Sequence, residues 1–230
     1  MSISSVHVMG DNLITTIAPE SRYDEFVDYV FNDFFPRESL ALSSGLMEQL
    51  NDDFRVFIEK WLSEGISLIT IDSSTDQIVG ICLNYVLDES SGFPTDQSDT
   101  DEIQPLDRII SFLNHLEEGY DAKEKFGNQT GMELLFLGTK EGYSGRGIAR
   151  NLAEKAMELA RTKQIGFIQC NPTAGATRHI FRSLDFETIS EMKLVDYFIN
   201  DQPGFPYAGP EEITQFVVKQ LWLLVNKLFA

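Results

Sequence analysis

The chain has 230 residues, and its 36 acidic against 18 basic side chains give it a formal net charge of −18. A chain of this length can bury a full core without disulfides or metal ions, whereas its acidity disfavours nucleic acid and anionic membrane surfaces as partners. Two cysteines, Cys82 and Cys170, lie within apolar segments and form no spaced framework, so neither an oxidising compartment nor a metal site is expected.

The first residues and the apolar runs give no reason to expect a targeting signal or a membrane span. No apolar run reaches the roughly 20 residues that span a bilayer, and the first residues, MSISSVHVMGDN, lack a cationic flank. We therefore expect a soluble, cytoplasmic protein.

The first third of the sequence predicts one strand and two helices. The strand lies near Val6 to Ala18, and apolar residues at helical spacing predict helices over Arg22 to Phe35 and over roughly Ser44 to Ser63. Between the two helices, Pro36-Arg37-Glu38 predicts a bend.

The next segment predicts a hairpin, an acidic loop and a helix. Two apolar strands are predicted, Ile66 to Asp72 and Ile78 to Val86, and a turn of Ser73 to Asp76 joins them. Residues 88–105 are polar and acidic, and a helix is predicted over Leu106 to Phe126. The acidic field over residues 88–125 favours either solubility alone or attraction of a cationic substrate.

A strand, a glycine-rich turn and a helix follow in MELLFLGTKEGYSGRGIAR, residues 132–150. Gly145 and Gly147 lack Cβ atoms, so the backbone can bring several N–H donors close to an anion. The positive end of the helix dipole lies behind those donors. This segment therefore predicts a site for a phosphate or pyrophosphate group.

Further strands and a helix complete the predicted domain. Strands are expected over Phe167 to Cys170, Ile189 to Tyr197 and Gln215 to Leu224, with a helix over Ala174 to Leu184. The tail from Glu211 to Ala230 is more apolar than a last strand requires. It predicts either a packed end or a contact with a second copy or a membrane surface, so the chain is expected to be a monomer or a homodimer.

The turn resembles the acetyl-CoA motif Q/R-x-x-G-x-G/A of the GNAT acetyltransferases. The matching residues are Ser144, Gly145, Arg146, Gly147, Ile148 and Ala149. The first position departs from the motif, because Ser144 stands where the family has Gln or Arg. Phe34 to Leu40, FFPRESL, is similar to the F-F-x-x-E-P-L segment of the invertebrate arylalkylamine N-acetyltransferases.

The resemblance covers most of the chain and implies one α/β domain over residues 1–230. The implied GNAT fold is a single mixed, largely antiparallel twisted sheet of about seven strands, with helices on both faces. A splayed central parallel pair would leave backbone groups of Leu137, Gly138 and Thr139 free to bind acetyl-CoA.

The resemblance also assigns the chemistry. A protonated amine titrates at roughly 10, so a base must remove a proton before it attacks the thioester. Glu38 matches the position of the subfamily's catalytic glutamate and is the expected base. Thr173 and Thr177, spaced i, i+4, are candidate acids for the thiolate, although a thiolate can also leave unprotonated.

Four aromatic residues are predicted to bind the substrate: Phe34, Phe35, Phe198 and Tyr207. The sequence therefore predicts an acetyl-CoA-dependent N-acetyltransferase that acts on a small arylalkylamine such as dopamine, tyramine or a tryptamine-like compound. Two alternatives stay open. One is an acetyltransferase for polyamines or other aliphatic amines, and the other is a non-catalytic acyl-CoA-binding protein.

Overall fold

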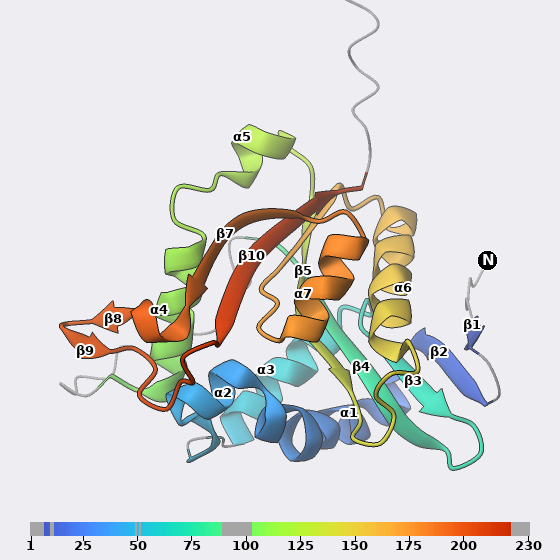
Figure 1. Ribbon diagram of the computed structural model, residues 1–230. Helices are drawn as coiled ribbons and strands as arrows, with labels where there is room; N and C mark the ends of the chain where they lie inside the picture. Colours follow the sequence, from blue (N-terminus) through green and yellow to red (C-terminus); the bar gives the residue numbers. More distant parts are fainter. Residues whose placement is uncertain (1–6, 10–11, 49, 51, 89–102, 222–230) are drawn as a thin grey trace, which may run out of the picture.

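The computed structural model describes residues 7–9, 12–48, 50, 52–88 and 103–221. Within them, an eight-stranded sheet runs in the order β1-β2-β3-β4-β5-β6-β10-β7 (Figure 1). Its strands are β1 (His7–Met9), β2 (Leu13–Ile17), β3 (Leu68–Asp72), β4 (Gln77–Val86), β5 (Gly131–Thr139), β6 (Phe167–Cys170), β7 (Glu187–Lys193) and β10 (Ile213–Gln220). A separate hairpin consists of β8 (Phe198–Ile199) and β9 (Gln202–Pro203).

Helices cover both faces of the sheet. The α-helices of the described residues are α1 (Tyr23–Tyr29), α2 (Ser39–Ser44), α3 (Asp52–Leu62), α4 (Pro105–Leu116), α5 (Ala122–Phe126), α6 (Ile148–Thr162) and α7 (Gly175–Ser183). One hydrophobic cluster packs under α1 to α4, and a second packs under α6 and α7, which lie side by side in Figure 1. None of the helices in these ranges is both long and apolar enough to cross a membrane.

The pairing of β5 with β6 is parallel, and the other strand pairs of the described sheet are antiparallel. The parallel pairing covers only Gly131 to Glu133 of β5, whereas β5 itself continues to Thr139. On its other side, β5 carries a bulge at Leu135, because Leu83 pairs with Phe136 and the next residue of β4 pairs with Leu134. The predicted mixed sheet with a splayed central parallel pair is confirmed.

The sheet has one strand more than the seven expected, because the strand predicted from Val6 to Ala18 is not continuous. Asn12 adopts the left-handed conformation with φ of 77°, and the chain reverses there. β1 and β2 therefore form an antiparallel hairpin in which Met9 pairs with Leu13.

The first helix, predicted over Arg22 to Phe35, is helical over nearly these residues but changes its type. It continues beyond Tyr29 as a π-helical turn, Val30–Phe34, and then as a 3-10 turn that contains Pro36. The second is wrong as a single helix, because Gly45 ends α2 with φ of 84° and α3 begins only at Asp52.

The helix predicted from Leu106 to Phe126 is also divided. Gly119, with φ of 78°, follows α4, and Asp121 then caps α5 by accepting hydrogen bonds from two backbone amides. Most of the predicted acidic loop, residues 89–102, and the end of the apolar tail, residues 222–230, lie outside the described residues.

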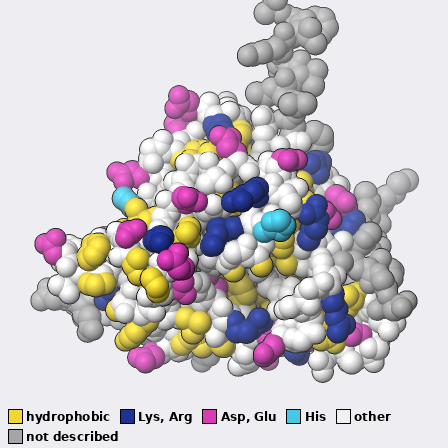
Figure 2. Space-filling model, in the orientation of Figure 1, with side chains coloured by type: hydrophobic (Ala, Val, Ile, Leu, Met, Phe, Trp, Pro, Cys, Tyr) yellow, Lys and Arg dark blue, Asp and Glu magenta, His cyan; other side chains and the backbone are white. Residues whose placement is uncertain are grey.

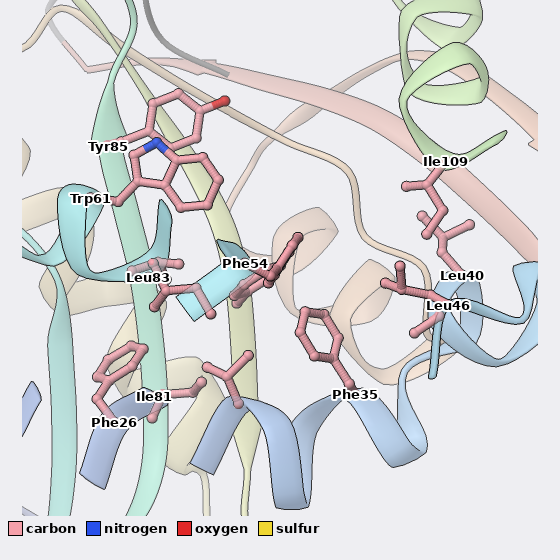
Figure 3. Close-up of a cluster of buried hydrophobic side chains, with 14 of the residues drawn as sticks. Phe26, Phe35, Leu40, Leu46, Phe54, Trp61, Ile81, Leu83, Tyr85 and Ile109 are labelled. Atoms are coloured by element: carbon pink, nitrogen blue, oxygen red, sulfur yellow. The ribbon is translucent and has the colours of Figure 1, made fainter. Parts of the chain in front are cut away.

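The core beneath α1 to α4 is rich in aromatic rings (Figure 3). Phe35 lies 5.5 Å from Phe54 and 5.4 Å from Phe136, measured between ring centroids, and both contacts are edge-to-face. Trp61 stacks on Tyr85 of β4 at 5.3 Å. Such pairs contribute about 1 kcal/mol each beyond their buried area, so this core fixes the segment before Glu38 against the sheet.

Candidate active site

A cavity of about 1140 Å³ opens where β5 and β6 separate. It lies between β5, one face of α4, α2 and the N-terminal parts of α6 and α7. Apolar side chains form much of its wall, including Leu40, Leu46, Phe54, Ile109, Leu113 and Phe136. Eight of the nine residues predicted to bind the cofactor also line it: Leu137, Gly138, Thr139, Ser144, Gly145, Gly147, Ile148 and Ala149.

The glycine-rich turn exposes the N-terminus of α6 to this cavity. Gly145 and Gly147 both adopt the left-handed conformation, with φ of 78° and 77°, which L-residues with a Cβ rarely take. Gly147 is the N-cap of α6, and no side chain caps the helix. The first turn of α6 holds no acidic residue, so its amides and its dipole favour an anion.

Arg146 is the predicted cofactor residue that does not line the cavity. Its guanidinium lies 4.6 Å from the centre of the Tyr143 ring, and the Tyr143 hydroxyl donates to Asp72 at 2.9 Å. Hydrogen bonds from Ser74 and Tyr143 lower the pKa of Asp72. These contacts hold the turn against the end of β3. The spacing of the motif did not indicate this structural role of Arg146.

Three arginines line the cavity despite the acidic composition, namely Arg37, Arg150 and Arg178. Figure 2 shows Lys and Arg side chains gathered over α6 and α7 on this face. Arg150 in α6 lines the cavity, and its Nε lies 2.9 Å from Glu154. The cavity therefore offers positive charge to an anionic ligand.

Glu38 reaches the cavity from the N-cap position of α2. Its Oε2 accepts a hydrogen bond from the Ala41 amide at 2.7 Å, and its Oε1 accepts one from the Thr173 hydroxyl at 2.8 Å. Burial raises the pKa of Glu38, while these hydrogen bonds and further amides of the first turn act in the opposite direction. The structure thus brings two of the predicted catalytic residues into contact.

Thr177 also lines the cavity, but its hydroxyl donates to the carbonyl of Ala174 at 2.8 Å. The helix predicted from Ala174 is observed as α7, which begins at Gly175 with Ala174 as its N-cap, so Thr173 lies before the helix. The Thr173 hydroxyl is therefore oriented by its hydrogen bond to Glu38, and Thr173 does not share a helical face with Thr177.

The four predicted aromatic residues separate into two pairs. Phe34 and Phe35 line the cavity, and the Phe34 ring lies 5.0 Å from Phe136. Phe198 and Tyr207 do not belong to the cavity wall and are 58% and 71% exposed. Phe198 lies in the hairpin of β8 and β9, which projects away from α6 and α7 (Figure 1).

Several carboxyl groups in the wall were not identified from the sequence, and two of them, Glu117 and Glu133, are set apart by their burial. Glu133 on β5 is only 5% exposed, and Glu117 follows the end of α4. Burial raises the pKa of Glu117 to about 7. Burial and then the charge of Glu117 raise the pKa of Glu133 well above its usual range. A lone acid within the apolar run MELLF was the available signal for Glu133, whereas Glu117 was hidden in an acidic segment.

No family model matches the sequence. Among solved structures, arylalkylamine N-acetyltransferase 2 of Aedes aegypti is 22% identical with a TM-score of 0.80, and the match covers 92% of this chain and 100% of that one. A polyamine N-acetyltransferase of Drosophila melanogaster is 14% identical with a TM-score of 0.75, over 90% of this chain and 99% of that one. An agmatine N-acetyltransferase is 15% identical with a TM-score of 0.76, over 91% and 100%. Together with the splayed strands and the turn before α6, these matches show that the chain has the predicted GNAT acetyltransferase fold.

Proposed function

We propose that this chain transfers the acetyl group of acetyl-CoA to the primary amine of a small arylalkylamine, such as dopamine, tyramine or a tryptamine-like compound, within one domain over residues 1–230. One observation carries the proposal. Glu38, hydrogen-bonded to Thr173, and the uncapped N-terminus of α6 border the same cavity. The similar arylalkylamine, agmatine and polyamine N-acetyltransferases support amine acetylation.

Acetyl-CoA would lie along the separated part of β5. Its pyrophosphate fits the amides between Gly145 and Ala149, where the backbone and the dipole of α6 favour negative charge. Beyond Glu133, β5 no longer pairs with β6, so peptide groups on that edge are available to the pantetheine arm. An amide among Leu137, Gly138 and Thr139 would polarise the thioester carbonyl.

Glu38 would act as the base. A protonated amine with a pKa of roughly 10 must lose a proton to attack, and the raised pKa of Glu38 strengthens it as an acceptor. Attack forms the N–C bond, breaks the C–S bond and releases CoA. Thr173 and Thr177 remain the candidate acids, and each hydroxyl would have to turn from its present acceptor to protonate the thiolate.

The apolar and aromatic wall favours an aryl substrate. Phe34, Phe35 and Phe136 line the cavity that Glu38 also lines, and buried apolar area contributes roughly 25 cal/mol per Å². A second candidate, an aliphatic diamine or polyamine, is favoured by Glu117 and Glu133, whose carboxyl groups line the same cavity.

The test is the release of CoA thiol from acetyl-CoA in the presence of a panel of amines that contains tyramine, tryptamine, agmatine and spermidine. We expect release with the arylalkylamines and a matching amount of N-acetylated product. A folded protein that binds acetyl-CoA but releases no CoA with any amine would be a sensor or a binding partner, and the proposal would be wrong.

A further inference from the structure

The contact between Glu38 and Thr173 joins two segments that are 135 residues apart. Such a contact depends on how the two segments are held, because Glu38 caps α2, whereas Thr173 belongs to the loop between β6 and α7. The structure supplies this support as a closed ring of hydrogen bonds that returns to α2 through the start of β10.

One half of the ring is made by Arg178 of α7. Its guanidinium donates to the carbonyl of Thr173 at 2.8 Å and also to the carbonyl of Ile213, the first residue of β10. The loop that carries Thr173 is thereby fixed to β10. The amide of Gln215 adds a backbone bond to the carbonyl of Pro172 at 3.3 Å.

Glu212 makes the other half. It directly precedes Ile213, and its carboxylate accepts hydrogen bonds from Ser39 at 3.0 Å, from Ser43 at 2.8 Å and from the amide of Gly209 at 2.8 Å. Ser39 and Ser43 belong to α2, which Glu38 caps. A six-residue helix is marginal on its own, so bonds from outside the helix determine where its first turn lies.

We propose that Glu212 is a positioning residue that holds the first turn of α2, and with it the carboxylate of Glu38, against Thr173, an inference that rests on the proposed acetyl transfer. Glu212 lines the cavity described above, but in this proposal it acts through Ser39 and Ser43 and not on the substrate. Arg178 completes the same ring from the side of Thr173.

In this proposal, loss of Glu212 changes the pKa of Glu38 in a definite direction. The amides of the first turn of α2 oppose the effect of burial on the pKa of Glu38, so a displaced turn leaves that pKa higher. Simple removal of a nearby negative charge would lower it instead. Removal of the positive charge of Arg178 would raise this pKa directly, so a substitution of Glu212 is the one that separates displacement of the turn from loss of charge.

The test is Glu212→Gln, because glutamine offers one acceptor oxygen in place of two. Glu38 is titrated by carbon NMR of side-chain-labelled glutamate, assigned with Glu38→Gln, and steady-state rates are measured in parallel. We expect the pKa of Glu38 to rise. We also expect kcat to fall about tenfold near neutral pH with an unchanged KM for acetyl-CoA, and no further loss when Glu212→Gln is added to Glu38→Ala.

Glu211→Gln is the matched control, because Glu211 is the adjacent acid, its side chain is 84% exposed, and it pairs only loosely with Lys193 at 3.4 Å. It should change none of these quantities. If Glu212→Gln does not fold, the Ser39→Ala/Ser43→Ala double variant keeps the charge of Glu212 and should also raise the pKa of Glu38.

An unchanged or lowered pKa of Glu38 in these variants overturns the positioning role, whatever the activity. The titration needs no turnover, so a protein without transferase activity still answers the question. A raised pKa of Glu38 combined with full activity of Glu38→Ala supports the positioning role and refutes Glu38 as the base.

Discussion

Gly147 is the residue on which cofactor binding depends most directly. It is the N-cap of α6, adopts the left-handed conformation and borders the cavity. A branched side chain there would both strain the backbone and stand between the amides and a pyrophosphate. We expect Gly147→Val to abolish acetyl-CoA binding in calorimetry while circular dichroism shows a folded protein. Gly142→Val is the control, because Gly142 has a similar φ of 83° with nothing within 4 Å of its added Cβ, and it should retain binding. Normal binding by folded Gly147→Val would remove the turn from the site.

Glu38 determines the chemical step. Glu38→Ala should keep its affinity for acetyl-CoA and lose on the order of 10²-fold in turnover at pH 7, the usual contribution of a positioned base. Raising the pH supplies neutral amine from solution, so the deficit should shrink toward about pH 9, closer to the amine's own pKa. Full turnover of this variant at pH 7 would assign the base to another residue.

Glu117 makes the stability of the protein depend on pH. Its pKa is about 7 in the folded protein, against 4.5 for an unperturbed glutamate side chain, so the folded state binds the proton more tightly. The unfolded state therefore releases its proton first, and the free energy of unfolding decreases as the pH rises between these two values.

Glu117→Gln should accordingly resemble the parent at about pH 4 and be more stable by roughly 2 kcal/mol at about pH 8, as measured by urea unfolding. Glu118→Gln, at the adjacent exposed position, is the control and should follow the parent at both values. A Glu117→Gln variant with the same pH dependence as the parent would show that the carboxyl group is well solvated.

At the scale of single elements, α2 is short and depends on its two ends. Glu38 caps its beginning, and Gly45 ends it in the left-handed conformation, where an added Cβ would lie 3.2 Å from the Tyr207 ring. We expect Gly45→Ala to lower the free energy of unfolding by about 1 kcal/mol or more.

Gly65→Ala separates the two causes of this loss. Gly65 also has a positive φ, of 68°, but an added Cβ there would meet nothing within 4 Å. The difference between the two variants, measured by denaturant unfolding, therefore gives the cost of the contact with Tyr207. Equal losses would show that the exposed Tyr207 ring moves aside freely.

At the scale of the whole molecule, composition and cavity favour different substrates. The net charge of −18 raises the local concentration of any cation, and salt weakens this effect. The wall next to Glu38 is largely apolar and aromatic, which favours a ring over an aliphatic chain.

We expect tyramine or tryptamine to exceed spermidine by one to two powers of ten in kcat/KM, with little change between low and high salt. Direct competition between the amines measures this ratio. A preference for spermidine that disappears at high salt would instead favour the second candidate function and assign Glu117 and Glu133 to the recognition of a distal cation.

Local features of the protein followed from its sequence. The strand, turn and helix around Gly145 and Gly147 lie as predicted, because apolar alternation, backbone freedom and helical spacing act over a few neighbouring residues. The hairpin of β3 and β4 and the candidate base Glu38 could be predicted for the same reason, because each lies within a short sequence motif.

Only the tertiary structure decided which distant residues meet. Periodicity shows which face of an element is apolar, but it contains no distance between elements, so the contact of Glu38 with Thr173 and the ring through Glu212 could not be derived from it. Aromatic character likewise failed to distinguish Phe35, which packs in the core beside the cavity, from Tyr207, which lies exposed. The sequence by itself determined the local elements and their chemistry, whereas packing determined the active-site geometry, because that geometry depends on contacts among elements that are far apart in the chain.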